Sequence, residues 1–208
     1  PTEISGVKKS RDYIAINVSS SDTIAGIDSI LIRLYNQSHD LVNTSLSTAS
    51  PGYSNFSALN DGIYFYNVSM NDTLNNENAL ETRNITLDTV SPIIVINSPS
   101  PTGVNLSQTS IFFNISINEV GESCHYSLDS GFTNISMSTT NNLHYNATNS
   151  TIGDSQYIVD FYCNDSAGNI ANISRNFGID TLNPSLIISQ PKNNSYTTNS
   201  LEINFTEG

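Results

Sequence analysis

The chain has 208 residues and carries 19 Asp or Glu against only 7 Lys or Arg, which gives a net charge of −12. Binding of nucleic acid needs a basic face, so this balance argues against a nucleic-acid partner. It argues equally against docking on an anionic membrane surface. No run of about 18 apolar residues occurs, so we expect no direct membrane insertion. The first residues show no signal-peptide pattern, and we expect a processed N-terminus or an excised fragment.

Polarity comes from amides and hydroxyls more than from charge. Only 12% of the residues are charged, whereas there are 29 Asn, 32 Ser and 19 Thr. Hydrophobic residues still make up 37% of the chain. Their ordered placement favours a folded chain over a disordered one.

Apolar and polar residues alternate in short segments along the whole chain. The first segment is YIAINVS (13–19), followed by IFFNISI (111–117) and, near the end, LEINFT (201–206). A period of two predicts strands with one face buried and the other in water. Strand candidates recur about every 8–12 residues between turns rich in Asn, Asp, Gly and Ser, a spacing typical of β-sandwiches. No comparably long segment keeps a helical period, so the sequence predicts an all-β protein.

One phrase occurs twice, 92 residues apart. Asp88-Thr89 and Pro92 recur as Asp180-Thr181 and Pro184, and Arg83 recurs as Arg175. A period of this size fits one small domain, and a proline at a strand start stiffens a short linker. We therefore expect semi-rigid joints between three units: a sandwich without its own first strand (1–90), a complete sandwich (91–183) and the first strands of a third unit (184–208).

The last segment leaves two possibilities open. Residues 184–208 contain two strands with apolar faces and nothing to complete a sandwich. They are either the start of a third unit in a longer tandem array or a donor that completes a neighbouring molecule by strand addition.

Two stretches of the second unit carry a family resemblance. YIVDFYCNDSAGN (157–169) and SRNFGIDTLNP (174–184) resemble the tandem immunoglobulin-like repeats of prokaryotic cell-surface proteins, those of archaea above all. The resemblance implies tandem immunoglobulin-like β-sandwiches outside the cell. Asp61 with Tyr64, and Asp154 with Tyr157, resemble the tyrosine corner of that fold. The chain has no Trp, so it is not an antibody-type domain.

Aligned on the family pattern, the two cysteines fall on neighbouring strands. Cys124 begins strand C and Cys163 ends strand F, and their counterparts in the first unit are close to Ile30 and Met70. The resemblance therefore implies a disulfide, given an extracellular setting. Two reduced, buried thiols are the alternative.

Catalysis and metal binding have little support. His39, His125 and His144 stand apart from any HExxH or GxSxG motif, so we expect no enzyme. Acids at the predicted domain ends could bind calcium through hard oxygen ligands, or could simply shape turns, which is the interpretation preferred here. They are Asp72, Asp88, Glu119, Asp165 and Asp180. We assign no metal site.

Asn-x-Ser/Thr sequons occur in roughly twofold excess over chance. Strand alternation generates some of them without any glycan, because residues i and i+2 share the solvent face. We expect N-linked glycans at several of the sites, with Asn67 and Asn84 preferred, and no other cofactor. The sixteen candidates are Asn17, Asn36, Asn43, Asn55, Asn67, Asn71, Asn84, Asn105, Asn114, Asn134, Asn146, Asn149, Asn164, Asn172, Asn193 and Asn204.

Together these features predict a structural protein. We expect a secreted, glycosylated rod that serves as a surface stalk or as a filament subunit assembled with copies of itself, with head-to-tail strand complementation as one route of assembly. The alternative is an adhesin that binds a glycan or protein through the aromatic tracts 64–66 or 161–162.

Overall fold

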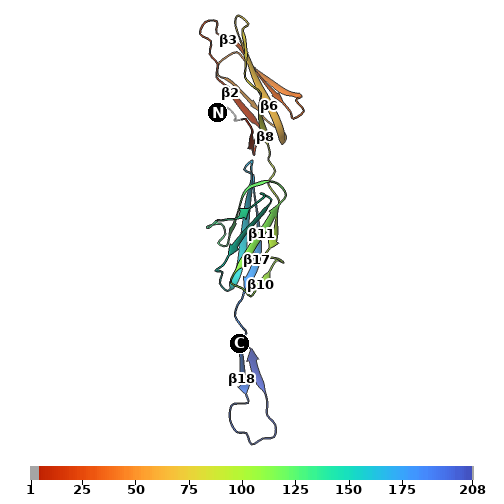
Figure 1. Ribbon diagram of the computed structural model, residues 1–208, viewed down its shortest axis with the longest axis vertical. Coiled ribbons are helices and arrows are strands. Elements are labelled where there is room, and N and C mark those ends of the chain that lie inside the picture. Colours follow the sequence, from red (N-terminus) through yellow and green to blue (C-terminus); the bar gives the residue numbers. More distant parts are fainter. Residues whose placement is uncertain (1–4, 208) are drawn as a thin grey trace.

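The computed structural model describes residues 5–207, and every regular element in that range is a β-strand. Among these residues there is no helix that could cross a membrane. The strands fall into three groups arranged one after another along a single long axis (Figure 1). Unit one contains β1–β8, unit two contains β9–β17, and the C-terminal hairpin contains β18 and β19. The fold is the all-β, immunoglobulin-like sandwich that the sequence predicts.

Unit one has two sheets. The larger runs β1-β8-β6-β3-β4, with β7 added to one end of β6, and the smaller is the pair β2-β5. The first strand lies parallel to β8, and the other pairs are antiparallel. The bounds are β1 (Val7–Lys9), β2 (Ile14–Val18), β3 (Ile27–Tyr35), β4 (Leu41–Ser47), β5 (Gly52–Phe56), β6 (Gly62–Asp72), β7 (Glu77–Ala79) and β8 (Arg83–Leu87).

Unit two repeats this plan with two more strands in the smaller sheet. Its larger sheet runs β10-β17-β16-β12-β13 and its smaller sheet runs β14-β15-β11-β9. The bounds are β9 (Ile94–Ser98), β10 (Val104–Leu106), β11 (Ile111–Ile117), β12 (Gly121–Ser127), β13 (Ile135–Ser136), β14 (Ser138–Thr139), β15 (His144–Asn149), β16 (Ser155–Asp165) and β17 (Ile170–Ile179). The first strand after Pro92 is β9, which forms an edge of the smaller sheet and pairs with β11.

Alternation places the cores where the sequence predicts them. In β2, Ile14, Ile16 and Val18 are buried while the residues between them are partly exposed, and β11 buries Ile111, Phe113, Ile115 and Ile117 in the same manner. Each sandwich closes around its own core, and the two clusters share no residue. The two units are therefore separate packing units joined through their ends.

The C-terminal strand prediction was wrong in its extent. The alternating segment 201–206 is a strand only from Asn204 onward, in β19 (Asn204–Glu207). Its one partner in the described chain is β18 (Leu186–Gln190), which offers four paired positions. Residues 201–203 alternate correctly but have no neighbouring strand to complete their hydrogen bonds, and strand geometry depends on that pairing.

Candidate functional site: the joint and the open edge

Each unit ends in a clasp between an aspartate and a threonine. Asp61 accepts hydrogen bonds from the Thr89 backbone N–H at 3.0 Å and from its hydroxyl at 3.1 Å. Asp154 accepts the same pair from Thr181 at 3.1 and 2.9 Å. The repeated Asp-Thr phrase thus ties the end of the last strand to the start of the preceding long strand, and it does so identically in both units.

A tyrosine fixes the approach to the same long strand. The Tyr64 hydroxyl donates to the Asn60 carbonyl at 3.0 Å, and the Tyr157 hydroxyl donates to the Gly153 carbonyl at 3.0 Å. Both bonds reach four residues upstream, which is the geometry of a tyrosine corner. Burial raises the pKa of Tyr64 above its ordinary value. Because the clasp and the tyrosine hydrogen bond occur in both units, the C-terminal ends of unit one and unit two have the same local structure.

The joint between the units is held by Asn169. This side chain is only 6% exposed; its Nδ2 donates to the Asp88 carbonyl at 2.8 Å and to Asp165 Oδ2 at 2.7 Å. Its Oδ1 accepts a hydrogen bond from the Ser10 hydroxyl. Asp88 and Ser10 belong to the end of unit one, whereas Asn169 lies in the turn between β16 and β17 of unit two. One buried amide therefore binds both units.

The turn that carries Asn169 is organised by Asp165. Its Oδ1 accepts the backbone N–H groups of Ala167, Gly168 and Asn169 at 2.8 to 2.9 Å. Burial alone would raise the pKa of Asp165, but the hydrogen bonds from Asn169 and this backbone hold it below its usual range. Unit one builds the same turn, since Asp72 accepts the Asn76 N–H at 2.9 Å and the Asn76 side chain at 2.7 Å.

Three carboxylates meet at the joint. Oxygen atoms of Asp88, Glu119 and Asp165 lie within 4.8 Å of one another. Burial, and then the charges of Asp88 and Asp165, raise the pKa of Glu119, while Lys8 opposes the rise. Of the five acids considered for calcium, these three come together and the other two lie elsewhere. Asp72 shapes its turn, and Asp180 accepts the Leu182 N–H at 3.1 Å.

The three histidines lie on different elements. His39 stacks on Phe65 with ring centroids 4.5 Å apart, His125 is on β12, and His144 at the start of β15 approaches Asn141. The structure does not bring them together.

The cysteines face each other across the large sheet of unit two. Cys124 on β12 and Cys163 on β16 are register partners, form a disulfide and are each 1% exposed. The corresponding register pair in unit one is Ile30 and Met70. One cross-strand position is thus filled by a covalent bond in one unit and by apolar contact in the other.

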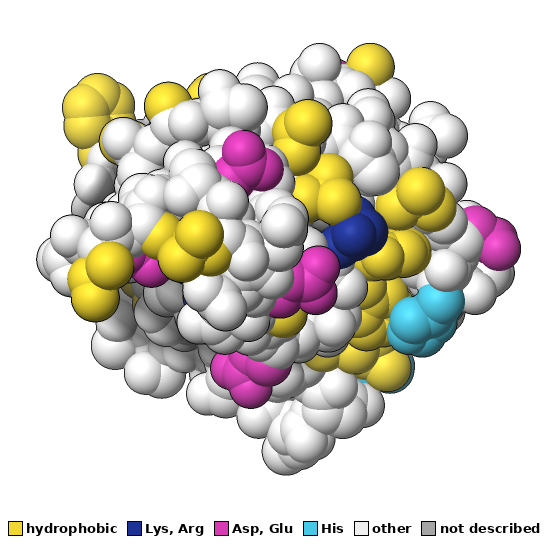
Figure 2. Space-filling model, turned by 90° about the horizontal axis from the view of Figure 1, so that it is seen from above, with side chains coloured by type: hydrophobic (Ala, Val, Ile, Leu, Met, Phe, Trp, Pro, Cys, Tyr) yellow, Lys and Arg dark blue, Asp and Glu magenta, His cyan; other side chains and the backbone are white. Residues whose placement is uncertain are grey.

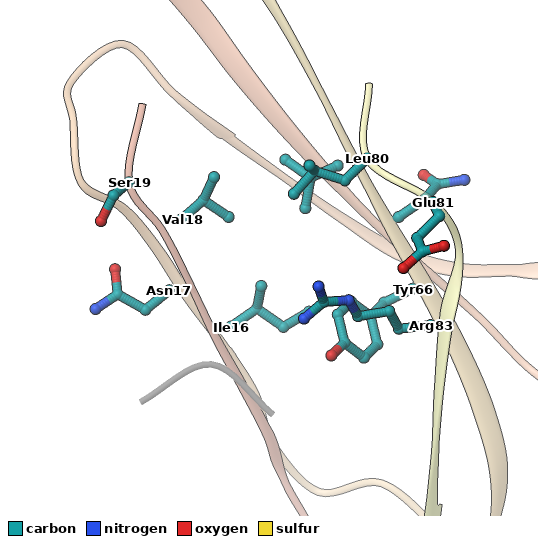
Figure 3. A pocket seen from close by; sticks show the side chains of 10 residues that line it. Ile16, Asn17, Val18, Ser19, Tyr66, Leu80, Glu81 and Arg83 are labelled. Carbon is teal, nitrogen blue, oxygen red and sulfur yellow. The ribbon is translucent and has the colours of Figure 1, made fainter. Parts of the chain in front are cut away.

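A groove runs along one edge of unit one. It has a volume of about 330 Å³ and lies between β2 and the segment that joins β7 to β8. Figure 3 shows Ile16 and Val18 on one side, with Leu80 and Arg83 on the other. Within residues 5–207, β2 pairs only with β5, whereas its counterpart β11 pairs with both β15 and β9. The groove therefore lies where unit two holds β9.

The sequon asparagines differ in accessibility. Those with exposed side chains are Asn43, Asn55, Asn105, Asn134, Asn172, Asn193 and Asn204. The two preferred sites are half-buried: Asn67 Oδ1 is enclosed, and Asn84 Oδ1 accepts the Ser5 hydroxyl at 3.0 Å. Asn164 accepts the Ser123 hydroxyl at 2.6 Å. The side chains engaged in such contacts are less available to a large modification than those at the exposed positions.

The end of the molecule formed by unit one has a mixed surface. Viewed from its N-terminal end, acidic side chains are scattered among uncharged ones and do not gather into a patch (Figure 2).

Sequence reasoning missed Asn169 and the two Asp–Thr clasps. Two signals were present: the Asp-to-Asn spacing of four residues at 72–76 and 165–169, and the repeat of Asp61 as Asp154.

Comparison with known proteins supports the fold. No protein-family model and no curated protein matches the chain. The fibronectin(III)-like modules of Clostridium thermocellum CbhA align over 85% of this chain and 90% of theirs, with a TM-score of 0.53 and 10% identity. The tetra-tandem repeat in the extending region of a large adhesion protein aligns over 88% of this chain and 49% of its own, with a TM-score of 0.38 and 14% identity. The FN1–FN3 domains of chicken CNTN1 align over 82% and 62%, with a TM-score of 0.43 and 13% identity.

Proposed function

We propose that the chain is a structural rod segment of an extracellular protein. The observation that carries this proposal is the buried Asn169, which binds the end of unit one to unit two and fixes the units end to end. A side chain with three partners in two units resists bending, because a bend breaks bonds that water reaches poorly. The hydrogen bond between Thr181 and Asp154 repeats the clasp of unit one, so the far end of unit two has the same local structure as the end of unit one that meets the joint.

An extracellular setting is supported by the disulfide and by the exposed sequons. Disulfides persist in oxidising surroundings, and Cys124–Cys163 is the one disulfide of the described chain. Glycans on exposed asparagines such as Asn55 and Asn172 would hydrate strands that carry few charges. We propose further that the parent protein is a stalk or a filament subunit on a prokaryotic cell surface, a proposal that the sequence resemblance to archaeal surface repeats supports.

The adhesin alternative loses its main support. Tyr64, Tyr66 and Phe161 are buried in the cores, and Phe65 is covered by His39. Neither aromatic tract offers an exposed pair of rings on which a sugar could stack. A spacing role, with any binding surface on another part of the protein, fits the molecule better.

Solution X-ray scattering of the full chain tests the rod. The proposal predicts an elongated particle whose distance distribution shows the separation of two units in line. A compact particle, or scattering that requires a broad set of angles between the units, would contradict it. The Asn169→Ala variant is the matched comparison, since it removes the joint and leaves both cores unchanged.

A further inference from the structure

Unit two shows how the first strand of a sandwich is held. The strand β9 pairs with β11 and buries Ile94 and Ile96, each 7% exposed. From the neighbouring sheet, Arg175 donates to the carbonyl oxygens of Ile96 at 3.4 Å and of Pro99 at 2.8 Å. An arginine on the last strand therefore binds the backbone of the first strand, whatever side chains that strand carries.

Unit one has the same strand plan, but no strand of residues 5–207 occupies its groove. Arg83 starts β8 at the position that Arg175 has in β17, and its side chain reaches into the groove toward Ile16 (Figure 3). Within residues 5–207 the Arg83 guanidinium has no hydrogen-bond partner, and no strand lies on this edge of β2. The groove thus combines a β2 edge that pairs with no strand of residues 5–207, an apolar floor and an arginine at the position of Arg175, and the corresponding features of unit two hold β9.

The C-terminal hairpin contains a strand of the matching kind. Pro184, Leu186, Ile188 and Pro191 repeat Pro92, Ile94, Ile96 and Pro99 at the same offset. The counterparts of the two buried isoleucines are exposed here, Leu186 at 67% and Ile188 at 66%. Only four positions pair β18 with β19, and an isolated two-stranded hairpin is marginally stable in water. Little free energy is therefore lost when β18 leaves β19 to pair with another strand.

We propose that residues 184–191 of a second copy of this chain dock in the groove of unit one as its first strand, with Leu186 and Ile188 entering the core and Arg83 binding the strand's carbonyl groups. The occupant is a second copy because β18 of the same chain lies beyond unit two, at the other end of the long axis (Figure 1). The proposal rests on the rod function and gives it a means of end-to-end assembly.

A labelled peptide tests the docking directly. The probe is a fluorescent peptide of residues 184–191, and the acceptor is the full chain carrying Ile188→Asp, which cannot donate its own strand. Fluorescence anisotropy should show saturable binding of this peptide. A control peptide with Leu186→Asp and Ile188→Asp should not bind, because its inward face is charged.

Matched variants test the role of the arginine. In the same acceptor, Arg83→Ala should weaken peptide binding about tenfold, as the loss of hydrogen bonds from a charged group does. Arg175→Ala should leave peptide binding unchanged, because that arginine already holds β9. Absence of saturable binding, equal binding of both peptides, or no effect of Arg83→Ala would each overturn the proposal.

Failure of docking and failure of the rod are distinguishable. Scattering of the Ile188→Asp chain alone reports its shape without assembly. An elongated monomer that does not bind the peptide refutes only the docking and leaves the rod in place. A compact monomer refutes the rod itself, whatever the peptide does.

Discussion

The two units follow one plan but are stabilised differently. Unit two has a centre of aromatic rings, a disulfide between β12 and β16, and β9 along the edge of β11. Unit one has aliphatic side chains such as Ile32 and Leu34 at its centre and the pair Ile30–Met70 in place of the disulfide. Strand order and register nevertheless agree, so the frame depends on alternation and turns more than on any one cross-link.

The last strand marks the clearest difference. In unit two β17 runs unbroken from Ile170 to Ile179, whereas in unit one the same path is divided into β7 and β8. The interruption carries Leu80, which is 55% exposed and forms part of the groove wall. The interrupted strand and the β2 edge without a second partner strand therefore occur together, and among the described residues unit one is the less complete of the two sandwiches.

The largest expected effect comes from the aromatic centre of unit two. Phe113 is fully buried and contacts the rings of Tyr126, Phe161 and Phe177. Phe113→Ala should lower the free energy of unfolding of unit two by about 3–5 kcal/mol because it leaves a cavity. Chemical denaturation should show a shift in the transition of unit two alone, since the cores are separate.

Its neighbour on the strand is the control. Phe112 lies on the outer face and is 48% exposed, so Phe112→Ala should change the stability of unit two much less. Equal losses for the two variants would show that the inward and outward faces of β11 are not distinguished by packing.

Removing the disulfide should have the next largest effect. The bond closes a loop with a sequence separation of 39 residues, for which the chain-entropy account gives about 3–4 kcal/mol. Thermal unfolding of a Cys124→Ala, Cys163→Ala double variant should therefore show unit two melting closer to unit one. If the double variant melts like the parent, the bond adds nothing to the difference between the units.

A joint variant should have a smaller and more local effect. Asn169→Ala removes bonds to Asp88 and Ser10, and limited proteolysis should cut the linker near Thr89 about tenfold faster, as expected for a loss of about 1–3 kcal/mol. Asn76→Ala is the matched control, because Asn76 organises the same turn at the far end of unit one. Equal acceleration by both variants would show that the linker is not protected by the joint.

The smallest effect concerns pH. The folded-state pKa of Glu119 is raised, so its charged form destabilises the joint above that pKa and the penalty disappears as pH falls below its ordinary value. Glu119→Gln should therefore stabilise the protein at neutral pH and converge with the parent in acid. Melting temperatures of the two proteins across pH measure this difference, and a difference independent of pH would contradict it.

Alternation predicted the strands far better than the contacts between them. The segment 111–117 is a strand over its full predicted length, because its neighbours on both sides supply hydrogen bonds. The segment 201–206 reads equally well in sequence but lacks that support. Burial on one face fixes the period of a strand, whereas its length depends on partners that lie far away in sequence.

The sequence analysis also missed the joint, because its hydrogen bonds connect residues that lie far apart in the sequence. The repeat located the boundary at Asp88 and identified Asp165 as an acid near a domain end. It did not indicate that Asn169, 81 residues from Asp88, would bind that carbonyl. Arg83 and Arg175 were matched by their spacing, but only the structure shows the backbone of β9 as the partner of one of them.

The most direct test of the account is the distribution of distances between the two units in solution. Spin labels at Thr44 on β4 and Ser138 on β14, both exposed, place one probe on each sandwich. The account predicts a single narrow distance for the parent chain and a broad distribution for Asn169→Ala. A broad distribution in the parent chain would show that the units move independently and that the chain is not a rod.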